Sequence, residues 1–164
     1  MKKLLTTLIA LTLITGTFIG KAFAQNPLFG KYGSMDNVEY VCITSPMLKL
    51  IGGGSTVING VEIKGITNAL KSLLIINAKE KNVLEVMKKD YQTLRQTDGY
   101  DVYMEVKDPD SNEHVTTIIG HNPDNDKEVE VVMSIDKSGT SHTFIVLTGK
   151  FTDEQLAKLL KGKS

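Results

Sequence analysis

Four strand-length segments follow one another in the second half of the chain, with only short turns between them. In residues 100–106, 113–121, 128–135 and 141–148, apolar side chains recur at about every second position, which is the period of a half-buried strand. The turns between them are rich in Asp, Asn, Pro and Gly, residues that favour tight reversals. Strands joined by such short connections pair antiparallel. The sequence therefore predicts an antiparallel meander.

Helical patterns and two further strands surround this meander. Apolar side chains between residues 79 and 95 recur at the spacing of an amphipathic helix. Thr152 and Gln155 have the spacing of a capping box, which predicts the start of a C-terminal helix. Residues 37–44 and 72–77 predict two earlier strands with a short helix between them.

The order of these elements is β-α-β-α-β-β-β-β-α. It predicts an α+β domain of two layers, in which an antiparallel-dominated sheet carries its helices on one face.

The first 24 residues have the organisation of a secretory signal peptide. A basic start precedes an apolar run over residues 4–19, and Ala22-Phe23-Ala24 then offers a cleavage pattern. The run is shorter than the roughly 20 residues that a membrane span needs. Gln25 stands where a lipoprotein would need a cysteine. We therefore predict a signal peptide over residues 1–24 and one exported α+β domain over residues 25–164, in the periplasm or outside the cell.

Removal of the signal peptide makes the chain mildly acidic. The full sequence has 19 basic and 19 acidic side chains, and losing three signal-peptide lysines leaves 16 against 19, a net charge of −3. An acidic domain has no electrostatic reason to bind nucleic acid. The single cysteine, Cys42, cannot form an intramolecular disulfide, and its apolar strand-like surroundings predict a small buried side chain.

No residue pattern identifies a catalytic, cofactor or metal site. The three histidines, His114, His121 and His142, fall too far apart on the predicted meander to share a zinc ion, although His114 and His142 would be neighbours two strands apart. The acidic turn at residues 108–112 begins like a calcium loop, but the required Gly and bidentate Glu are missing. We therefore favour a protein without enzymatic activity. An unrecognised hydrolase ranks third, after two non-enzymatic functions: binding a partner and carrying a small ligand or lipid.

Six short segments of core and turn residues, spread over nearly the whole mature chain, form a distinctive combination. They are Leu28-Phe29-Gly30-Lys31-Tyr32, residues 38–47, Leu73-Leu74, Gly99-Tyr100, Met104-Glu105-Val106-Lys107 and Leu147-Thr148-Gly149-Lys150-Phe151. In this combination the chain resembles a domain-of-unknown-function family, number four-two-five-two, of small exported proteins from Bacteroides-type bacteria. The resemblance implies an exported bacterial domain with a role in the cell envelope. The family has no established activity, so no functional residue is carried over.

A possible interface lies on the sheet face that the helices would leave open. Tyr103 would point away from Val102 and Met104, and four further side chains share its predicted alternation. The predicted row is Tyr103, Ile118, Val132, Ile145 and Leu147. An exposed apolar row marks an interface, unless a further element covers it or both faces are buried.

Two non-enzymatic functions remain open from these patterns. The first is a non-enzymatic binding or interaction protein of the envelope, whose partner is an unknown protein or a second copy of the chain. The alternative is a small-ligand or lipid carrier with a pocket between sheet and helices and a lid formed by the loop at residues 52–55.

Overall fold

The computed structural model describes residues 27–51, 57–58, 61–62, 65–122 and 125–161. The predicted signal peptide and the predicted glycine-rich lid lie outside the described residues. The chain divides into two units at the Gly30–Lys31 bond. Of the first unit, only a short helix, α2 (Pro27–Gly30), is described.

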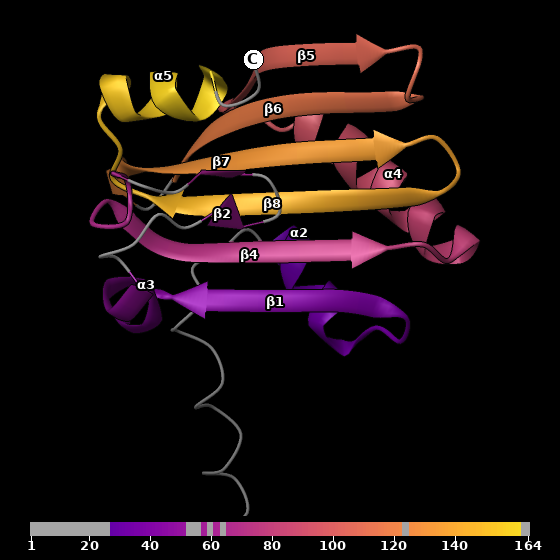
Figure 1. Cartoon of the computed structure of the whole chain (residues 1–164), viewed down its shortest axis with the longest axis horizontal. Coiled ribbons are helices and arrows are strands. Elements are labelled where there is room, and N and C mark those ends of the chain that lie inside the picture. The colour runs from indigo at the N-terminus through magenta and orange to yellow at the C-terminus, as the bar shows by residue number, and fades with distance from the viewer. Residues whose placement is uncertain (1–26, 52–56, 59–60, 63–64, 123–124, 162–164) are drawn as a thin grey trace, which may run out of the picture. The chain divides into compact units, whose positions relative to one another are not determined.

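Six antiparallel strands form the main sheet, in the spatial order β1-β4-β8-β7-β6-β5 (Figure 1). The last four strands are consecutive neighbours, as the predicted meander requires, and β1 and β5 are the two edges. The strands are β1 (Val38–Thr44), β4 (Leu70–Ala78), β5 (Tyr100–Asp108), β6 (Glu113–Asn122), β7 (Asn125–Lys137) and β8 (Ser141–Gly149). A separate two-stranded hairpin of β2 (Val57–Ile58) and β3 (Val61–Glu62) was not predicted.

The three predicted helices are present, and the α+β class is confirmed. They are α3 (Ser45–Ile51), α4 (Lys81–Arg95) and α5 (Asp153–Lys161), and a short 3-10 helix, η1 (Lys31–Ser34), precedes β1. The capping box of α5 forms as expected: the N–H of Thr152 donates to Gln155 Oε1 at 2.9 Å, and the N–H of Gln155 donates to Thr152 Oγ1 at 3.3 Å.

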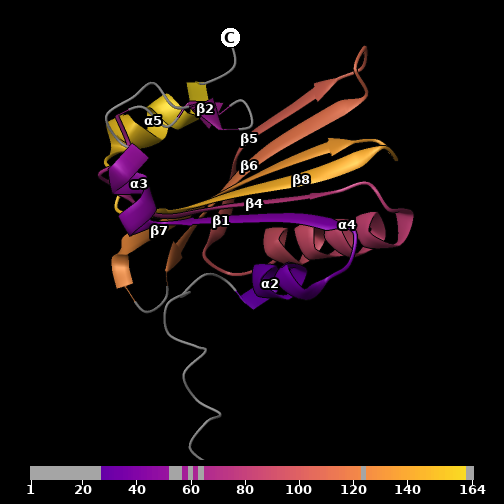
Figure 2. The same ribbon diagram turned by 60° about the horizontal axis from the view of Figure 1, so that its bottom comes forward.

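The helices are divided between the two faces of the sheet, which corrects the expectation that they cover one face (Figure 2). From α4, Tyr91 reaches Thr116 of β6, and we call this side of the sheet the α4 face. From α5, Leu159 packs in a cluster with Leu147 of β8, on what we call the α5 face. Adjacent residues of a strand point to opposite faces, so a strand that is apolar without interruption is buried on both. The continuous apolar run within β8 is such a pattern and indicates that this strand is buried on both faces.

The α5 face holds an aliphatic core. Leu48 of α3 and Leu159 of α5 contribute to it, as does Ile66 from the segment before β4. The sheet supplies the other buried members: Leu70, Leu73, Ile75, Ile119, Val129, Val131, Ile145 and Leu147. Full burial of one such side chain contributes about 1.5–3 kcal/mol, so this layer is a main source of the stability of the domain.

Candidate functional site

The five residues predicted to form one exposed row do not lie together. Ile118 pairs with Val132 on the α4 face, whereas Ile145 and Leu147 belong to the core on the α5 face. All four are fully buried, and Tyr103 alone is exposed. The prediction was wrong because alternation shows which residues of one strand share a face, but not which residues of the next strand lie on that face. In the structure Val146 of β8, and not Ile145, lies opposite Val132 of β7.

Tyr103 lies at an irregularity in β5. The pairing with β6 shifts between Val102 and Met104, which makes Tyr103 the extra residue of a β-bulge. Because the bulge adds one residue, Val102 is opposite Ile118 on the α4 face while Met104 is opposite Thr117 on the α5 face. The alternation predicted from Tyr100 to Val106 is therefore interrupted at Tyr103, so that its apolar residues before and after the bulge lie on opposite faces of the sheet.

Three apolar side chains remain exposed along β5. Val102, Tyr103 and Val106 have exposed fractions of 40%, 55% and 49%. The strand is the last in the sheet (Figure 1), so no strand within the described ranges pairs with its outer backbone groups. We call Val102, Tyr103 and Val106, together with these backbone groups, the β5 edge. An unpaired strand edge is a template for another strand.

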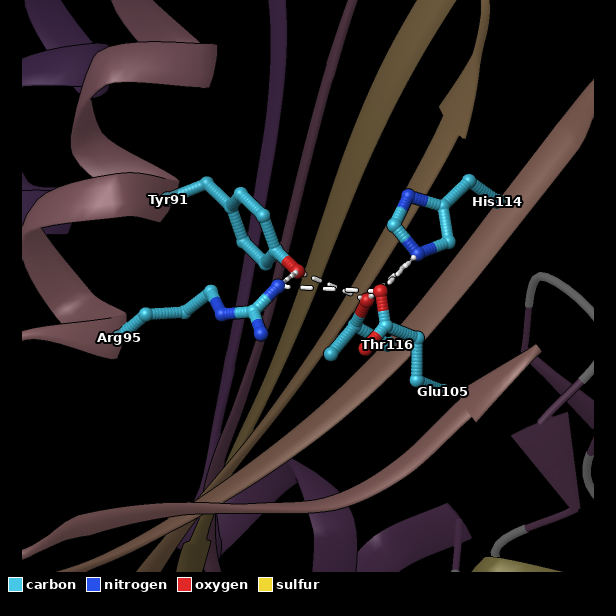
Figure 3. A network of polar contacts seen from close by, with 5 residues as sticks. All are labelled: Tyr91, Arg95, Glu105, His114 and Thr116. Atoms are coloured by element: carbon cyan, nitrogen blue, oxygen red, sulfur yellow. Dashed lines mark hydrogen bonds and ion pairs between the residues drawn. The ribbon is translucent and has the colours of Figure 1, made fainter. Parts of the chain in front are cut away.

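A polar network ties β5 and β6 to α4 (Figure 3). Tyr91 and Arg95 lie one turn apart on α4, and Arg95 donates to the Tyr91 hydroxyl at 2.9 Å. The same hydroxyl bonds Thr116 Oγ1 of β6 at 2.9 Å. Both Tyr91 and Thr116 are buried. The tyrosine hydroxyl thus connects the helix to the sheet.

The network continues to the edge strand through Glu105. His114 Nε2 of β6 lies 2.8 Å from Glu105 Oε1, and the Arg95 guanidinium lies 3.8 Å from the same oxygen. His114 Nε2 is also 3.4 Å from Thr116 Oγ1. These contacts hold the C-terminal half of β5 on its α4 side. We call Tyr91, Arg95, Glu105, His114 and Thr116 the α4 network.

A second buried group lies on the same face. Ser134 Oγ of β7 is 2.8 Å from His142 Nε2 of β8. His142 is only 1% exposed, and its Nδ1 has no hydrogen-bond partner among the described residues. Burial lowers the pKa of His142 to about 4; Lys88 and His114 act in the same direction and Asp136 in the opposite one. His142 is therefore neutral at pH 7.

Ser134, His142 and Asp136 are the residue types of a hydrolytic triad, but their geometry differs from one. In a triad the carboxylate bonds Nδ1 of the histidine, and here Nδ1 has no such bond among the described residues. Ser134 is also buried on the sheet. Sequence reasoning missed this contact because the two residues meet only through the β7–β8 register, eight positions apart.

A buried carboxylate fastens the start of the second unit to α4. Asp90 is 5% exposed. It accepts a 2.5 Å hydrogen bond from the Tyr32 hydroxyl, and Lys31 Nζ lies 2.6 Å from its Oδ2. Burial, followed by the bond to Asp90, raises the pKa of Tyr32. A buried carboxylate requires such partners, so these three residues act in packing η1 onto the helix.

A comparison with protein-family models matches residues 32–159 to a domain of unknown function, DUF4252. The chain belongs to this family. The family resemblance inferred from the sequence is thereby confirmed. No curated protein and no solved structure matches the chain. The DUF4252 match runs from Tyr32 to Leu159, so it contains the α4 network, the His142 group and the β5 edge.

The histidines and the acidic turn of this DUF4252 domain, which are the candidate metal ligands in the sequence, have structural contacts. His114 and His142 both lie opposite Asp136, two strands apart as expected. Within the described residues no three potential ligands gather around a metal position. The Asp108 carboxylate accepts hydrogen bonds from within its own turn, of which the one from the Ser111 hydroxyl does most to lower its pKa.

The thiol of Cys42 is half-buried rather than fully buried, and its burial raises its pKa. Among the helices that the structure describes, none combines the length and apolar character needed to cross a bilayer.

Proposed function

We propose that this chain is an exported, non-enzymatic domain of the cell envelope that binds a protein partner through the β5 edge. The observation that carries the proposal is the exposure of Val102, Tyr103 and Val106 on a strand whose outer side is unpaired. Strand addition to such an edge combines main-chain hydrogen bonds with side-chain contacts. The proposed interface is thus the edge of the sheet, in place of the open sheet face that the sequence predicted.

The α4 network supports binding at this edge. It holds Glu105 from the α4 side through His114 and Arg95, so β5 is ordered before a partner arrives. A pre-ordered strand loses less conformational entropy on binding than a loop does.

The buried polar groups support a structural role rather than catalysis. Thr116, Ser134 and His142 are all buried, so a substrate has no direct access to them. The side chains between α4 and the sheet also contact one another: the ring centroids of His142 and Phe144 are 4.7 Å apart, and those of Tyr32 and Phe144 are 6.4 Å apart. This packing gives the alternative of a ligand carrier no support.

The proposed export rests on the pattern of residues 1–24. The N-terminal sequence of the protein recovered from its source cells tests it. We expect the mature chain to begin at Gln25 and to be found outside the inner membrane. A chain that begins at Met1 would contradict the export proposal.

Site-specific photo-crosslinking in the source cells tests the β5 edge. A photoreactive amino acid replaces Val106, and in a matched control it replaces Val41, which is exposed to 38% on the opposite edge strand, β1. We expect a discrete protein adduct from position 106 and none from position 41. Adducts from position 41 alone, or from neither position, would overturn the proposal for β5.

A further inference from the structure

The bulge at Tyr103 divides the β5 edge into two unequal halves. From Met104 to Asp108 the pairing with β6 is continuous, running from Met104–Thr117 to Asp108–Glu113. A bulge bends its strand and interrupts the ladder locally. The C-terminal half, residues 104–108, is therefore the part of the edge that offers a regular ladder to an added strand.

The charges of this half are complementary to themselves. Glu105 and Lys107 lie on the α4 face, and Val106 lies between them on the α5 face. In an antiparallel pairing of residues 104–108 with the same segment of a second copy, centred on Val106, each Glu105 is opposite the Lys107 of the other copy. Opposite charges directly across a pair of strands are stabilising. The two-fold symmetry forms this pair twice.

Other registers of the same pairing are unfavourable. Centring the pairing on Glu105 places two carboxylates opposite each other, and centring it on Lys107 does the same with two ammonium groups. A shift by one residue would instead place side chains of the α4 face opposite those of the α5 face. The charges thus select the register centred on Val106.

Glu105 and Lys107 can each form a further ion pair. The contacts of Glu105 with His114 and Arg95 both use Oε1, and the Glu105 side chain is 36% exposed, so Oε2 can meet a second partner. Lys107 is exposed and makes no ion pair with any residue that the structure describes. In Figure 1 the Asp108 end of β5 lies away from α5, so that helix does not cover this half of the edge.

The opposite edge lacks this complementarity. The only charged side chain of β1 is Glu39, which already accepts a hydrogen bond from Asn77. An antiparallel pairing of β1 with itself would therefore form no ion pair. The self-complementary charges are specific to β5.

We propose that the partner of the β5 edge is a second copy of this chain, paired antiparallel through residues 104–108 about Val106. This inference rests on the proposed function, because it names the partner of the same edge. The pairing would join two six-stranded sheets into one. An interface of about five residues per strand lies at the small end of specific contacts, so the dimer is expected to be weak and to depend on concentration.

Sedimentation equilibrium of the processed chain tests the inference first. We expect a monomer–dimer equilibrium, and we expect Lys107→Glu to weaken it by about tenfold because it places two like-charged pairs across the interface. Glu105→Lys alone should weaken it similarly. An equimolar mixture of the two variants should recover the dimer, because both pairs are then of opposite charge. Circular dichroism of each variant establishes that it is folded.

Disulfide trapping tests the register. In a Cys42→Ala background, Val106→Cys places two thiols opposite each other at the two-fold axis, within the Cα separation of about 4.4–6.8 Å that a disulfide needs. We expect rapid oxidation to a covalent dimer. Val102→Cys, on the other side of the bulge and similarly exposed, should oxidise much more slowly.

The outcomes separate this inference from the proposed function. A strictly monomeric chain, with an in-cell adduct at position 106 whose mass is that of a different protein, would overturn self-pairing and leave the β5 edge as a binding surface. A monomer without any adduct would overturn both. A dimer that is insensitive to Lys107→Glu and is not trapped by Val106→Cys would place the contact elsewhere and overturn the register.

Discussion

The two faces of the main sheet are covered by helices through different kinds of contact. On the α5 face, Leu48 and Leu159 meet the side chains of the strands in an aliphatic cluster. On the α4 face, buried apolar residues are interspersed with Thr116, Ser134 and His142. Helix α4 itself contributes Asp90 and Tyr91 to hydrogen bonds with residues outside the helix.

This difference shows two ways to attach a helix to the same sheet. Apolar packing is non-directional and depends mainly on buried area, so the α5 face should respond to changes of volume. Buried hydrogen bonds depend on exact partners and on protonation, so the α4 face should respond to pH and to the loss of single polar atoms. Substitutions on each face and a change of pH can test this division.

Truncation in the aliphatic layer should have the largest effect. Leu147→Ala removes a fully buried side chain of the α5 face, and we expect a loss of about 3–4 kcal/mol in the free energy of unfolding because a cavity remains. Urea denaturation measures it. The matched control is Leu50→Ala, at a leucine that is 83% exposed, and it should change stability little. Equal losses at both positions would contradict the proposed core.

Acid should weaken the α4 face. The pKa of His142 is about 4 in the folded protein and about 6.5 in an exposed histidine. Below pH 6.5 the unfolded chain therefore binds a proton that the folded chain does not, so stability is lost as the pH falls from 6.5 towards 4. At pH 4.5 we expect this group to lower the free energy of unfolding by about 2.5 kcal/mol relative to pH 7.

Urea denaturation of two histidine variants isolates this effect of pH. His142→Gln should remove about 2.5 kcal/mol from the pH dependence. His121→Gln, at an exposed histidine, should leave the pH dependence unchanged. The same pH profile in the wild type and in the His142 variant would show that other groups cause the acid sensitivity.

A methyl group at Gly120 should disturb the α4 face by steric overlap. Gly120 is paired with Tyr100, and a Cβ at this glycine would overlap the Tyr100 ring. We expect Gly120→Ala to cost about 2 kcal/mol from overpacking, measured by thermal denaturation. The cost should shrink in a Tyr100→Ala background. Gly33→Ala is the control, because its Cβ would meet Tyr40 at an ordinary 3.5 Å; an equal cost there would argue against overlap as the cause.

Removing one hydroxyl from the α4 network should have the smallest of these effects. Tyr91→Phe deletes the atom that joins Arg95 to Thr116, and we expect a loss of about 1 kcal/mol in the free energy of unfolding. Tyr103→Phe is the control, since the hydroxyl of that exposed tyrosine makes no hydrogen bond within the described residues. If the two variants were equally stable, the Tyr91 hydroxyl would contribute nothing to attaching the helix.

Local sequence patterns predicted the elements well. The 3.6-residue period between residues 79 and 95 identified α4, because one side of the helix faces the sheet and the other faces solvent. Thr152 and Gln155 identified the start of α5 through contacts three residues apart. Such features depend on neighbours in the sequence, which a single chain displays directly.

Features that depend on the register between strands could not be predicted. The pairing of Val132 with Val146 decides that Ile145 faces the α5 side, and it is set by the contacts of whole strands. The bulge at Tyr103 moves Met104 to the face opposite that of Val102 although the residues alternate regularly in sequence. The contact of Ser134 with His142 likewise exists only across two paired strands.

The position of β8 in the sheet has a consequence for the order in which the domain can fold. This strand lies between β4 and β7, although it is the last in sequence of the strands that the structure describes. A chain that emerges with its N-terminus first can therefore form the β1–β4 pair early, but β4 lacks its second neighbour until residues 141–149 arrive. Pairing between segments so distant in sequence is intrinsically slow. Completion of the sheet is thus delayed until residues 141–149 have emerged, and until then β4 keeps one unpaired side.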